Sequence, residues 1–255
     1  MIPSTRMARM QSVERPGTQP HANGEPVPSS HPFHPSFAPL LRADPSRPFV
    51  VAQLGQSLDG RIATDNGQSR DINGSDALDH LHGLRAHVEA VVVGIGTVLA
   101  DDPQLTVRRV PGQSPTRVIL DTKGKLPDRA RCFRDGGAPC LVVRADDRPA
   151  PDGVEVLRLA ANGGGQIAPQ TIVEALFARG LRRLLIEGGA HTVSRFIEAG
   201  CIDRLHVLVA PMIIGSGKPS LALAPVDALS KALRPRADIY VLPSGDVLFD
   251  CDLKA

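Results

Sequence analysis

The chain has 255 residues, of which 42% are hydrophobic and 22% are charged, and its formal net charge is +2. This length and composition suit a globular domain with a full core, and the small net charge gives no reason to expect a nucleic-acid partner. The chain has no Trp and one Tyr, which argues against a platform for stacking bases, and no apolar run approaches the roughly 20 residues that span a membrane.

Residues 1–47 differ from the rest in composition, because Pro, Ser, Gly, His and Arg dominate and no periodic apolar pattern is present. We predict a disordered Pro/His-rich tail over 1–47 and a folded domain over 48–255. The histidines of the tail lack the spacing of metal ligands, so no metal is expected. No apolar core of a signal peptide follows the basic start, and the four cysteines are scattered, which is typical of reduced thiols in a cytoplasmic protein.

Strands and helices alternate along the folded part. Apolar and β-branched runs predict strands at 49–54, 89–93, 116–121, 140–143, 154–157, 182–187, 204–210, 239–242 and 247–251. Helices are expected from an N-cap at Ser75 to His87, over 172–177, and from 193 to a C-cap at Gly200, with a short helix after residue 94 that Thr97 caps and Pro103 ends. This order predicts an α/β three-layer sandwich with a mostly parallel central sheet and a C-terminal antiparallel hairpin at one edge.

Glycine-containing or polar loops follow three of the predicted strands, at 55–60, 94–101 and 187–192. Ligands of such sheets bind outside the carboxyl ends of the strands, so these loops predict a crevice for a nucleotide or cofactor. The alternative for each loop taken alone is a tight turn that needs glycine.

The segment 94–108 is the densest of these patterns. Two glycines end a strand, a short helix follows, and Asp101, Asp102, Arg108 and Arg109 come directly after it. A helix N-terminus, a carboxylate and a cation so close together are typical of a site where an anionic ligand meets a reacting group. An ordinary loop with solvated charges is the other interpretation.

Several short motifs occur in one order and spacing. They are Ser57-Leu58-Asp59-Gly60, Arg85-Ala86, the segment 94–108, Glu187-Gly188-Gly189 and Ala210-Pro211-Met212-Ile213-Ile214-Gly215. Together they resemble the reductase family of riboflavin biosynthesis, over about residues 48–252. The resemblance implies a dihydrofolate-reductase-like fold, NADPH as cofactor, a homodimer, and reduction of the ribosyl group of a ribosylaminopyrimidine 5′-phosphate to the ribityl form.

Many bacteria fuse this reductase behind a zinc deaminase. Here the preceding segment is short and has no deaminase signature, so we expect a free-standing reductase.

The resemblance also implies roles for individual residues. The positions that match NADPH-binding residues of the family are Gly55, Thr97, Asp101, Thr122, Gly189, Ala190, His191, Thr192, Val193, Ser194 and Arg195. The positions that match substrate-binding residues are Ser69, Arg85, Leu105, Arg108 and Glu187. Hydride transfer also needs a group that handles a proton, for which Asp101 and Glu187 are the candidates, with Asp101 nearer the reacting carbon and Glu187 holding substrate.

Two residues depart from the pattern of the fused bacterial reductases. Gln53 stands where these enzymes usually have a lysine, and Asp71 stands where bulkier or apolar residues are common. These departures leave two alternatives, namely a reductase of another pterin-like or nucleotide-like substrate, and a non-catalytic NADP-binding module.

Overall fold

A computed structural model describes residues 34–134 and 137–255, so most of the expected tail, 1–33, lies outside the described residues. The strands of the main sheet are β1 (Phe49–Ser57), β3 (Ala90–Gly94), β4 (Thr116–Leu120), β5 (Cys140–Arg144), β6 (Glu155–Arg158), β7 (Arg183–Glu187), β8 (Arg204–Ala210), β10 (Arg236–Val241) and β11 (Val247–Asp252). The α-helices are α1 (Ala38–Leu41), α2 (Ser75–His87), α3 (Ile95–Asp101), α4 (Pro169–Ala178) and α5 (Ala190–Glu198).

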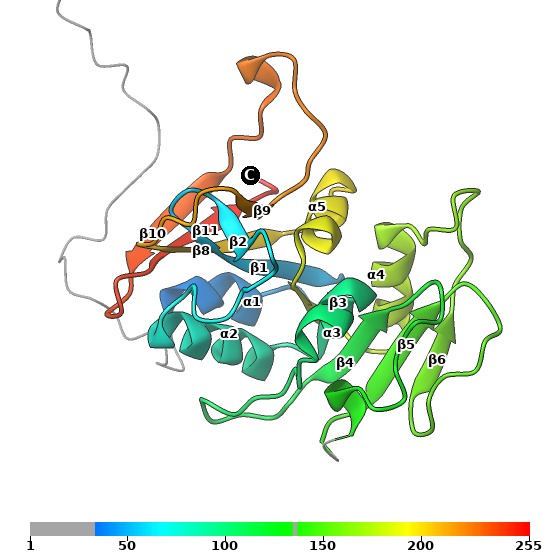
Figure 1. Cartoon of the computed structure of the whole chain (residues 1–255). Coiled ribbons are helices and arrows are strands. Elements are labelled where there is room, and N and C mark those ends of the chain that lie inside the picture. The colour runs from blue at the N-terminus through cyan, green and yellow to red at the C-terminus, as the bar shows by residue number, and fades with distance from the viewer. Residues whose placement is uncertain (1–33, 135–136) are drawn as a thin grey trace, which may run out of the picture.

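The main sheet has nine strands in the order β10-β11-β8-β1-β7-β3-β4-β5-β6 (Figure 1). All neighbouring pairs from β8 to β6 are parallel, whereas β11 is antiparallel to both β8 and β10. This confirms the expected mostly parallel sheet with a C-terminal hairpin at one edge. The other edge strand, β6, is short and half-exposed.

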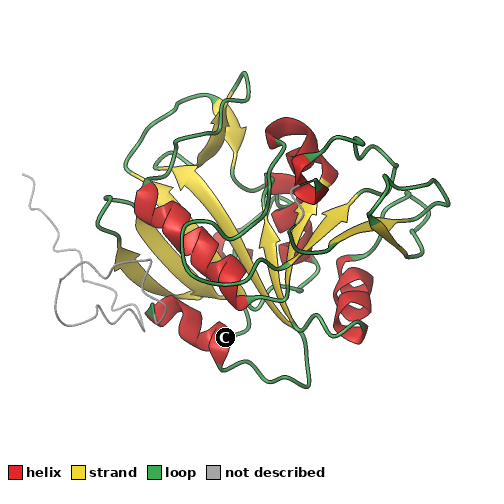
Figure 2. Cartoon of the chain, turned by 90° about the horizontal axis from the view of Figure 1, so that it is seen from below, coloured by secondary structure: helices red, strands yellow, loops and turns green. Residues whose placement is uncertain are grey.

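Helices cover both faces of this sheet (Figure 2). Alternate residues of the buried strands point to opposite faces, so Val50 and Val92 pack with α4 and α5, while Val51 and Val93 pack with α2 and α3. Because both faces are buried, the central strands are continuously apolar. The three-layer sandwich expected from the sequence is therefore confirmed.

A second, two-stranded sheet joins β2 (Arg61–Thr64) to β9 (Gly217–Pro219). The sequence pattern predicts no strand at either segment. A Cβ atom on Gly217 would lie 2.3 Å from the carbonyl oxygen of Ala63, so the close approach of the two strands requires glycine there.

Three helix ends differ from the sequence-based expectation. The N-cap of α2 is Gly74 and not Ser75, and the N-cap of α3 is Gly94, so Thr97 lies inside α3 and does not cap it. Helix α5 ends at a C-cap on Ala199, one residue before Gly200. Gly200 has a φ of 64°, which is the left-handed conformation that glycine provides just after a C-cap.

The segment before β1 is folded from at least residue 34, so the domain boundary expected at residue 48 is too late. Phe37 and Leu40 are 1% and 2% exposed and join the core beneath α2. The Phe37 ring lies where a Cβ on Gly83 would be, 2.7 Å from its nearest atom, and it stacks on His80 with ring centroids 5.1 Å apart. The sequence pattern does not predict this folded segment, because its composition is rich in Pro and His. Its two buried apolar side chains, Phe37 and Leu40, are too few to form a periodic pattern.

A row of buried polar side chains connects α2 to the hairpin edge of the sheet. His80 and His206 lie 3.0 Å apart through ring nitrogens, and the other ring nitrogen of His206 is 3.1 Å from Asp250. Burial holds the pKa of His80 well below its ordinary value. Burial raises the pKa of Asp250, but hydrogen bonds from His206 and Arg204 outweigh this effect and leave it below the ordinary value.

Within the described ranges, no helix has the length and apolar character needed to cross a membrane. The four cysteines are free thiols. No group of three or more His, Cys, Asp or Glu side chains in these ranges is arranged to hold a metal ion.

Candidate functional site

The expected site residues gather at the carboxyl edge of the parallel strands. Gly55 lies in β1, Thr97 and Asp101 in α3, Thr122 directly after β4, Glu187 at the end of β7, Gly189 to Arg195 at the start of α5, Ser69 in the loop before α2, Arg85 in α2, and Leu105 and Arg108 in the loop after α3. Parallel strands end on one side of a sheet, which is why segments far apart in sequence meet there.

Arg85 and Glu187 form a buried ion pair between α2 and β7. Arg85 Nε donates to Glu187 Oε2 at 2.8 Å and Arg85 Nη2 donates to Oε1, while the two side chains are 6% and 13% exposed. Arg85 Nη1 also donates to the carbonyl of Thr106 at 3.0 Å. Three donors of Arg85 are therefore already bound within the protein, and Glu187 is held in a fixed orientation beside the buried Gln53, its neighbour in β1.

The two acids after α3 have different surroundings. Asp101 is exposed, and its Oδ1 accepts a hydrogen bond from Ser69 Oγ at 3.3 Å. Asp102 has a left-handed backbone with φ of 41°, and its Oδ1 accepts the N–H of Arg131 at 2.8 Å. Asp102 thus has a structural role, because it binds the backbone of Arg131. Asp101 instead faces the loop that carries Ser69.

Leu105 holds the loop after α3 in an unusual conformation. Its φ is 59°, and its side chain is 1% exposed in the core beneath α2. A bulky residue with positive φ is strained, and such strain persists only where surrounding packing fixes it, as happens at functional sites. The anchored Leu105 therefore fixes the position of the buried Thr106 and the point at which the exposed Arg108 leaves the core.

The glycine turn at the end of β3 and the glycine turn at the end of β7 pack against each other. A Cβ on Gly188, whose φ is 101°, would lie 2.9 Å from Thr97 Oγ1, and a Cβ on Gly94 would lie 2.5 Å from Thr192 Oγ1. Each threonine therefore fills the space left by the other turn's glycine. The two turns form a small-residue cradle at the N-terminus of α5, whose first amides have no partner within the helix.

Three of the expected cofactor-binding side chains in α5 are engaged elsewhere. Val193 lies in the core, Ser194 Oγ accepts the N–H of Ala222 at 2.8 Å, and Arg195 Nη2 donates to the carbonyl of Ile167 at 2.9 Å. The structure does not bring these side chains toward the cradle. At the cradle, α5 presents the side chain of Thr192 and the backbone of its first turn.

The loop after β4 is built on a buried acid that the sequence analysis did not single out. Asp121 is fully buried, and its carboxylate accepts the N–H groups of Lys125 and Leu126 at 2.8 Å each. Buried Arg144 reaches the same carboxylate at 3.4 Å. This arrangement leaves Thr122 half-buried and Lys123 exposed at the rim of the sheet.

Gly55 has a structural explanation that the sequence did not reveal. A Cβ at this position would lie 1.9 Å from Asn73 Oδ1, so Asn73 occupies the space. The Asn73 amide donates to the carbonyl of Leu208 at 3.1 Å and to Asp246 at 2.8 Å. Asn73 and Asp246 therefore connect β1, the start of α2 and the C-terminal hairpin, and the Asn-Gly pair that opens the helix was their only sequence signal.

Asp59 holds together the loops on either side of the small sheet. It accepts hydrogen bonds from Ser57 Oγ at 2.6 Å and from the N–H groups of Ile214 and Gly215 at 3.1 and 2.7 Å. These bonds lower the pKa of Asp59 from its ordinary value to about 2. Because the folded-state pKa is lowered, the stabilisation is complete above the ordinary value and is lost as pH falls toward 2.

We expect Asp59→Ala to speed amide exchange of Ile214 and Gly215 by about tenfold at neutral pH, since each amide loses one hydrogen bond. Hydrogen exchange read by NMR measures this effect, and Asp65→Ala, at an exposed residue of the loop after β2, is the matched control. The difference in unfolding free energy between wild type and Asp59→Ala should shrink as pH falls from about 4 to 2. Equal exchange rates at neutral pH in the two variants would contradict this account.

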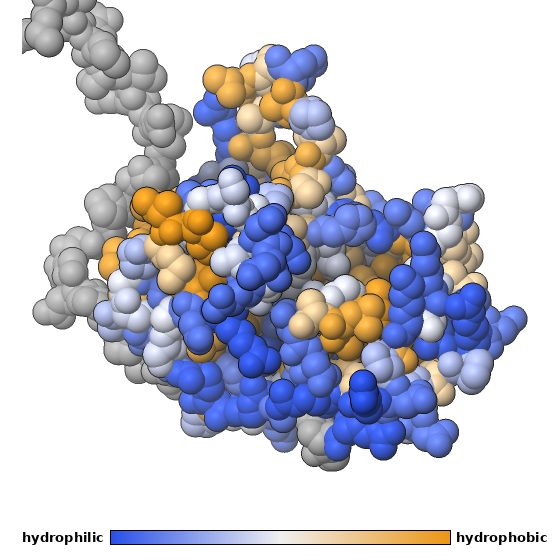
Figure 3. Space-filling model, in the orientation of Figure 1, coloured by the Kyte–Doolittle hydropathy of each residue, from blue (hydrophilic) through white to orange (hydrophobic). Residues whose placement is uncertain are grey.

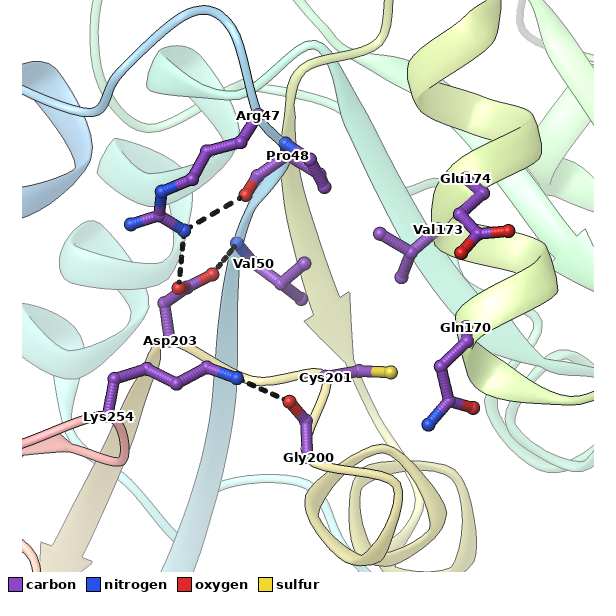
Figure 4. A pocket seen from close by; sticks show the side chains of 10 residues that line it. All are labelled: Arg47, Pro48, Val50, Gln170, Val173, Glu174, Gly200, Cys201, Asp203 and Lys254. Atoms are coloured by element: carbon purple, nitrogen blue, oxygen red, sulfur yellow. Dashed lines mark hydrogen bonds and ion pairs between the residues drawn. The ribbon is translucent and has the colours of Figure 1, made fainter.

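A cavity of about 270 Å³ lies at the opposite edge, near the amino ends of β1 and β8 (Figure 4). Three of its four charged groups are already bound, because Arg47 pairs with Asp203 at 3.0 Å and Lys254 donates to the carbonyl of Gly200, while the fourth, Glu174, is exposed. Burial raises the pKa of the Cys201 thiol that faces it, which makes this thiol a poor nucleophile. The cavity is therefore a weaker candidate than the carboxyl edge.

The sheet order and the antiparallel hairpin at one edge define an α/β protein of the dihydrofolate-reductase-like fold class. The RibD C-terminal domain family matches residues 48–237. The chain belongs to this family.

Relatives of two kinds are similar to the chain. The 2,5-diamino-6-ribosylamino-4(3H)-pyrimidinone 5′-phosphate reductase of Methanothermobacter thermautotrophicus is 36% identical over 198 residues, which cover 74% of this chain and 90% of that protein. The riboflavin biosynthesis protein RibD of Aquifex aeolicus is 34% identical over 67% of this chain, but the match spans only 48% of that longer protein. In length, the chain thus corresponds to the first kind.

Solved structures agree with this assignment. Acinetobacter baumannii RibD superimposes with a TM-score of 0.70 at 29% identity, covering 86% of this chain and 61% of that one. The riboflavin biosynthesis reductase Rib7 of Saccharomyces cerevisiae has the same fold, with a TM-score of 0.70 at 23% identity, covering 86% of this chain and 98% of that one.

Proposed function

We propose that this protein is an NADPH-dependent reductase that converts the ribosyl group of a ribosylaminopyrimidine 5′-phosphate to the ribityl form. The observation that carries the proposal is the placement of exposed Asp101 between the glycine cradle and the loop that presents Arg108, in a chain whose relative of similar length is named as this reductase.

The cradle fits a dinucleotide. The turns at Gly188 and Gly94 have no room for larger side chains, and a helix N-terminus such as that of α5 favours a pyrophosphate. Thr97 and the backbone of Gly189 to Thr192 would hold the cofactor, which supplies a hydride when bound. Thr122 and Lys123 at the end of β4 support a 2′-phosphate, since a hydroxyl and an exposed cation lie at the rim. NADPH is therefore proposed over NADH.

The acidic and arginine side chains of the site have different roles toward the substrate. Asp101 is the exposed carboxyl that moves the proton accompanying hydride transfer to the opened sugar, with Ser69 holding its orientation. Glu187, fixed by Arg85, orients a polar group of the substrate through its remaining lone pairs. Arg108 is exposed and receives the 5′-phosphate, whereas buried Arg85 positions Glu187 and the Thr106 backbone.

Anaerobic NADPH oxidation with the deaminated and undeaminated pyrimidines side by side tests the proposal. Turnover of either substrate, with a lower rate when NADH replaces NADPH, is the expected result. If NADPH binds but neither pyrimidine is reduced, the chain is a non-catalytic NADP-binding module. If NADPH is oxidised only with another pterin-like substrate, the substrate assignment is wrong.

Arg108→Ala is expected to raise KM for the phosphorylated substrate by about 10- to 100-fold with a smaller effect on kcat, because one charge-assisted contact to phosphate is lost. Steady-state kinetics measure this effect. Arg236→Ala is the control, since Arg236 is an exposed arginine on the edge strand β10. An equal rise in KM in both variants would show a general charge effect and no specific contact.

The proposed enzyme is a homodimer. Ile239 and Val241 on the edge strand β10 are 45% and 58% exposed, and apolar side chains also gather on the projection formed by residues 220–235 (Figure 3). Ile239→Lys/Val241→Lys is expected to shift a dimer toward monomer in sedimentation velocity, because two charges would enter the interface. Glu155→Lys on the opposite edge strand is the control, and an unchanged dimer in the double variant would place the interface elsewhere.

A further inference from the structure

One face of α2 binds the loop that follows Leu105. Arg109 bonds to Asp79 Oδ1 at 2.5 Å and to Ser75 Oγ at 2.6 Å, one turn apart at the start of the helix. At the other end of the helix, Arg85 Nη1 donates a hydrogen bond to the carbonyl of Thr106 at 3.0 Å. Contacts of α2 therefore bracket Arg108 on both sides along the chain.

His82 lies between these two anchors and contacts Arg108 itself. The N–H of Arg108 donates to His82 Nδ1 at 2.9 Å, and His82 is 4% exposed. Since Nδ1 accepts, it carries no proton, and the ring proton is on Nε2. The contact is to the main chain of Arg108 and does not involve its guanidinium, which donates to Thr106 Oγ1.

The surroundings of His82 keep it an acceptor. Burial, and then the positive charges of Arg85, Arg108 and Arg109, lower its pKa to about 3. A protonated ring would lose the Arg108 contact, because both nitrogens would then be donors. The ring is thus neutral at neutral pH.

We infer that His82 is a positioning residue for phosphate recognition, holding the backbone of Arg108 so that its guanidinium is presented to the 5′-phosphate of the substrate. This inference rests on the proposed function and adds a residue from α2 to the substrate site. The role is specific to phosphate, because His82 contacts neither the proposed proton-handling acid Asp101 nor the glycine cradle in the described contacts.

The test compares His82→Leu with His82→Asn, whose Oδ1 takes roughly the place of Nδ1. We expect His82→Leu to raise KM for the phosphorylated substrate by about tenfold with kcat within about twofold, and to leave KM for the dephosphorylated ribosylaminopyrimidine unchanged. His82→Asn should restore most of the affinity. Thermal unfolding of both variants shows whether each is folded.

A similar rise in KM for both substrates would overturn the inference, because it would indicate a purely structural role. A KM for the phosphorylated substrate that His82→Leu leaves unchanged would also overturn it. If the wild type reduces neither pyrimidine, the proposed function has failed. Calorimetry with ribose 5-phosphate then decides, and equal affinities of wild type and His82→Leu overturn the inference.

Discussion

Asp101→Asn is expected to lower kcat by about 10²- to 10⁴-fold while NADPH affinity stays within about twofold of wild type. The asparagine has the shape of the aspartate and still accepts the hydrogen bond from Ser69 Oγ, so the loop geometry is retained. It lacks the carboxyl needed to move a proton. Stopped-flow reduction under saturating NADPH measures the chemical step, and fluorescence titration measures cofactor affinity.

Asp102→Asn is the matched control for this prediction. The two acids are adjacent in sequence, but Asp102 Oδ1 accepts the N–H of Arg131, and an asparagine tolerates the left-handed backbone there. We expect nearly wild-type turnover from this variant. Full activity in Asp101→Asn, or an equal loss in both variants, would remove Asp101 from the mechanism.

The second large effect concerns the buried ion pair. Glu187→Gln leaves the guanidinium of Arg85, 6% exposed, without a neutralising charge, and is expected to reduce the unfolding free energy by about 3 kcal/mol. For a domain of this size the unfolding midpoint should fall by roughly 6–12 °C. Urea unfolding followed by circular dichroism measures the change, and turnover should fall as well because Glu187 orients the substrate.

A double variant separates stability from function at this pair. Arg85→Met/Glu187→Leu removes both charges, so it should recover much of the stability lost in Glu187→Gln. It should remain inactive, since the carboxylate of Glu187 that orients the substrate is gone. A stable and active double variant would show that the pair serves folding alone, and a Glu187→Gln variant as stable as wild type would contradict the buried-charge argument.

Much of the fold was predictable because its strands are buried on both faces. In segments such as Ala90–Gly94 and Arg183–Glu187, the apolar residues of the segment itself are enough to predict a strand. The alternation of such strands with helices then implies a parallel sheet. The β2–β9 pair was not predictable, because it joins segments about 150 residues apart and one of them is Gly217–Pro219. The folded segment around Phe37 was missed for a related reason, since the space it fills is created by Gly83 in another element.

The site was predictable in position but not in its internal contacts. Glycine and polar loops after strands locate the edge, yet nothing local indicates that Arg85 binds Glu187 across 102 residues of sequence. For the same reason, Val193 and Ser194 matched a cofactor-binding segment while their side chains point to the core and to Ala222. Motif positions thus include residues that build a site as well as residues that face its ligand.

The reciprocal fit of Thr97 with Gly188 and of Thr192 with Gly94 has an evolutionary consequence. Gly188 must stay glycine in any case, because its φ of 101° strains every other residue, whereas Gly94 can be replaced only if Thr192 becomes smaller. The residues at positions 94 and 192 should therefore change together among relatives. Cofactor specificity should change more readily at the rim after β4, where Lys123 is exposed and has no such dependence on a second turn.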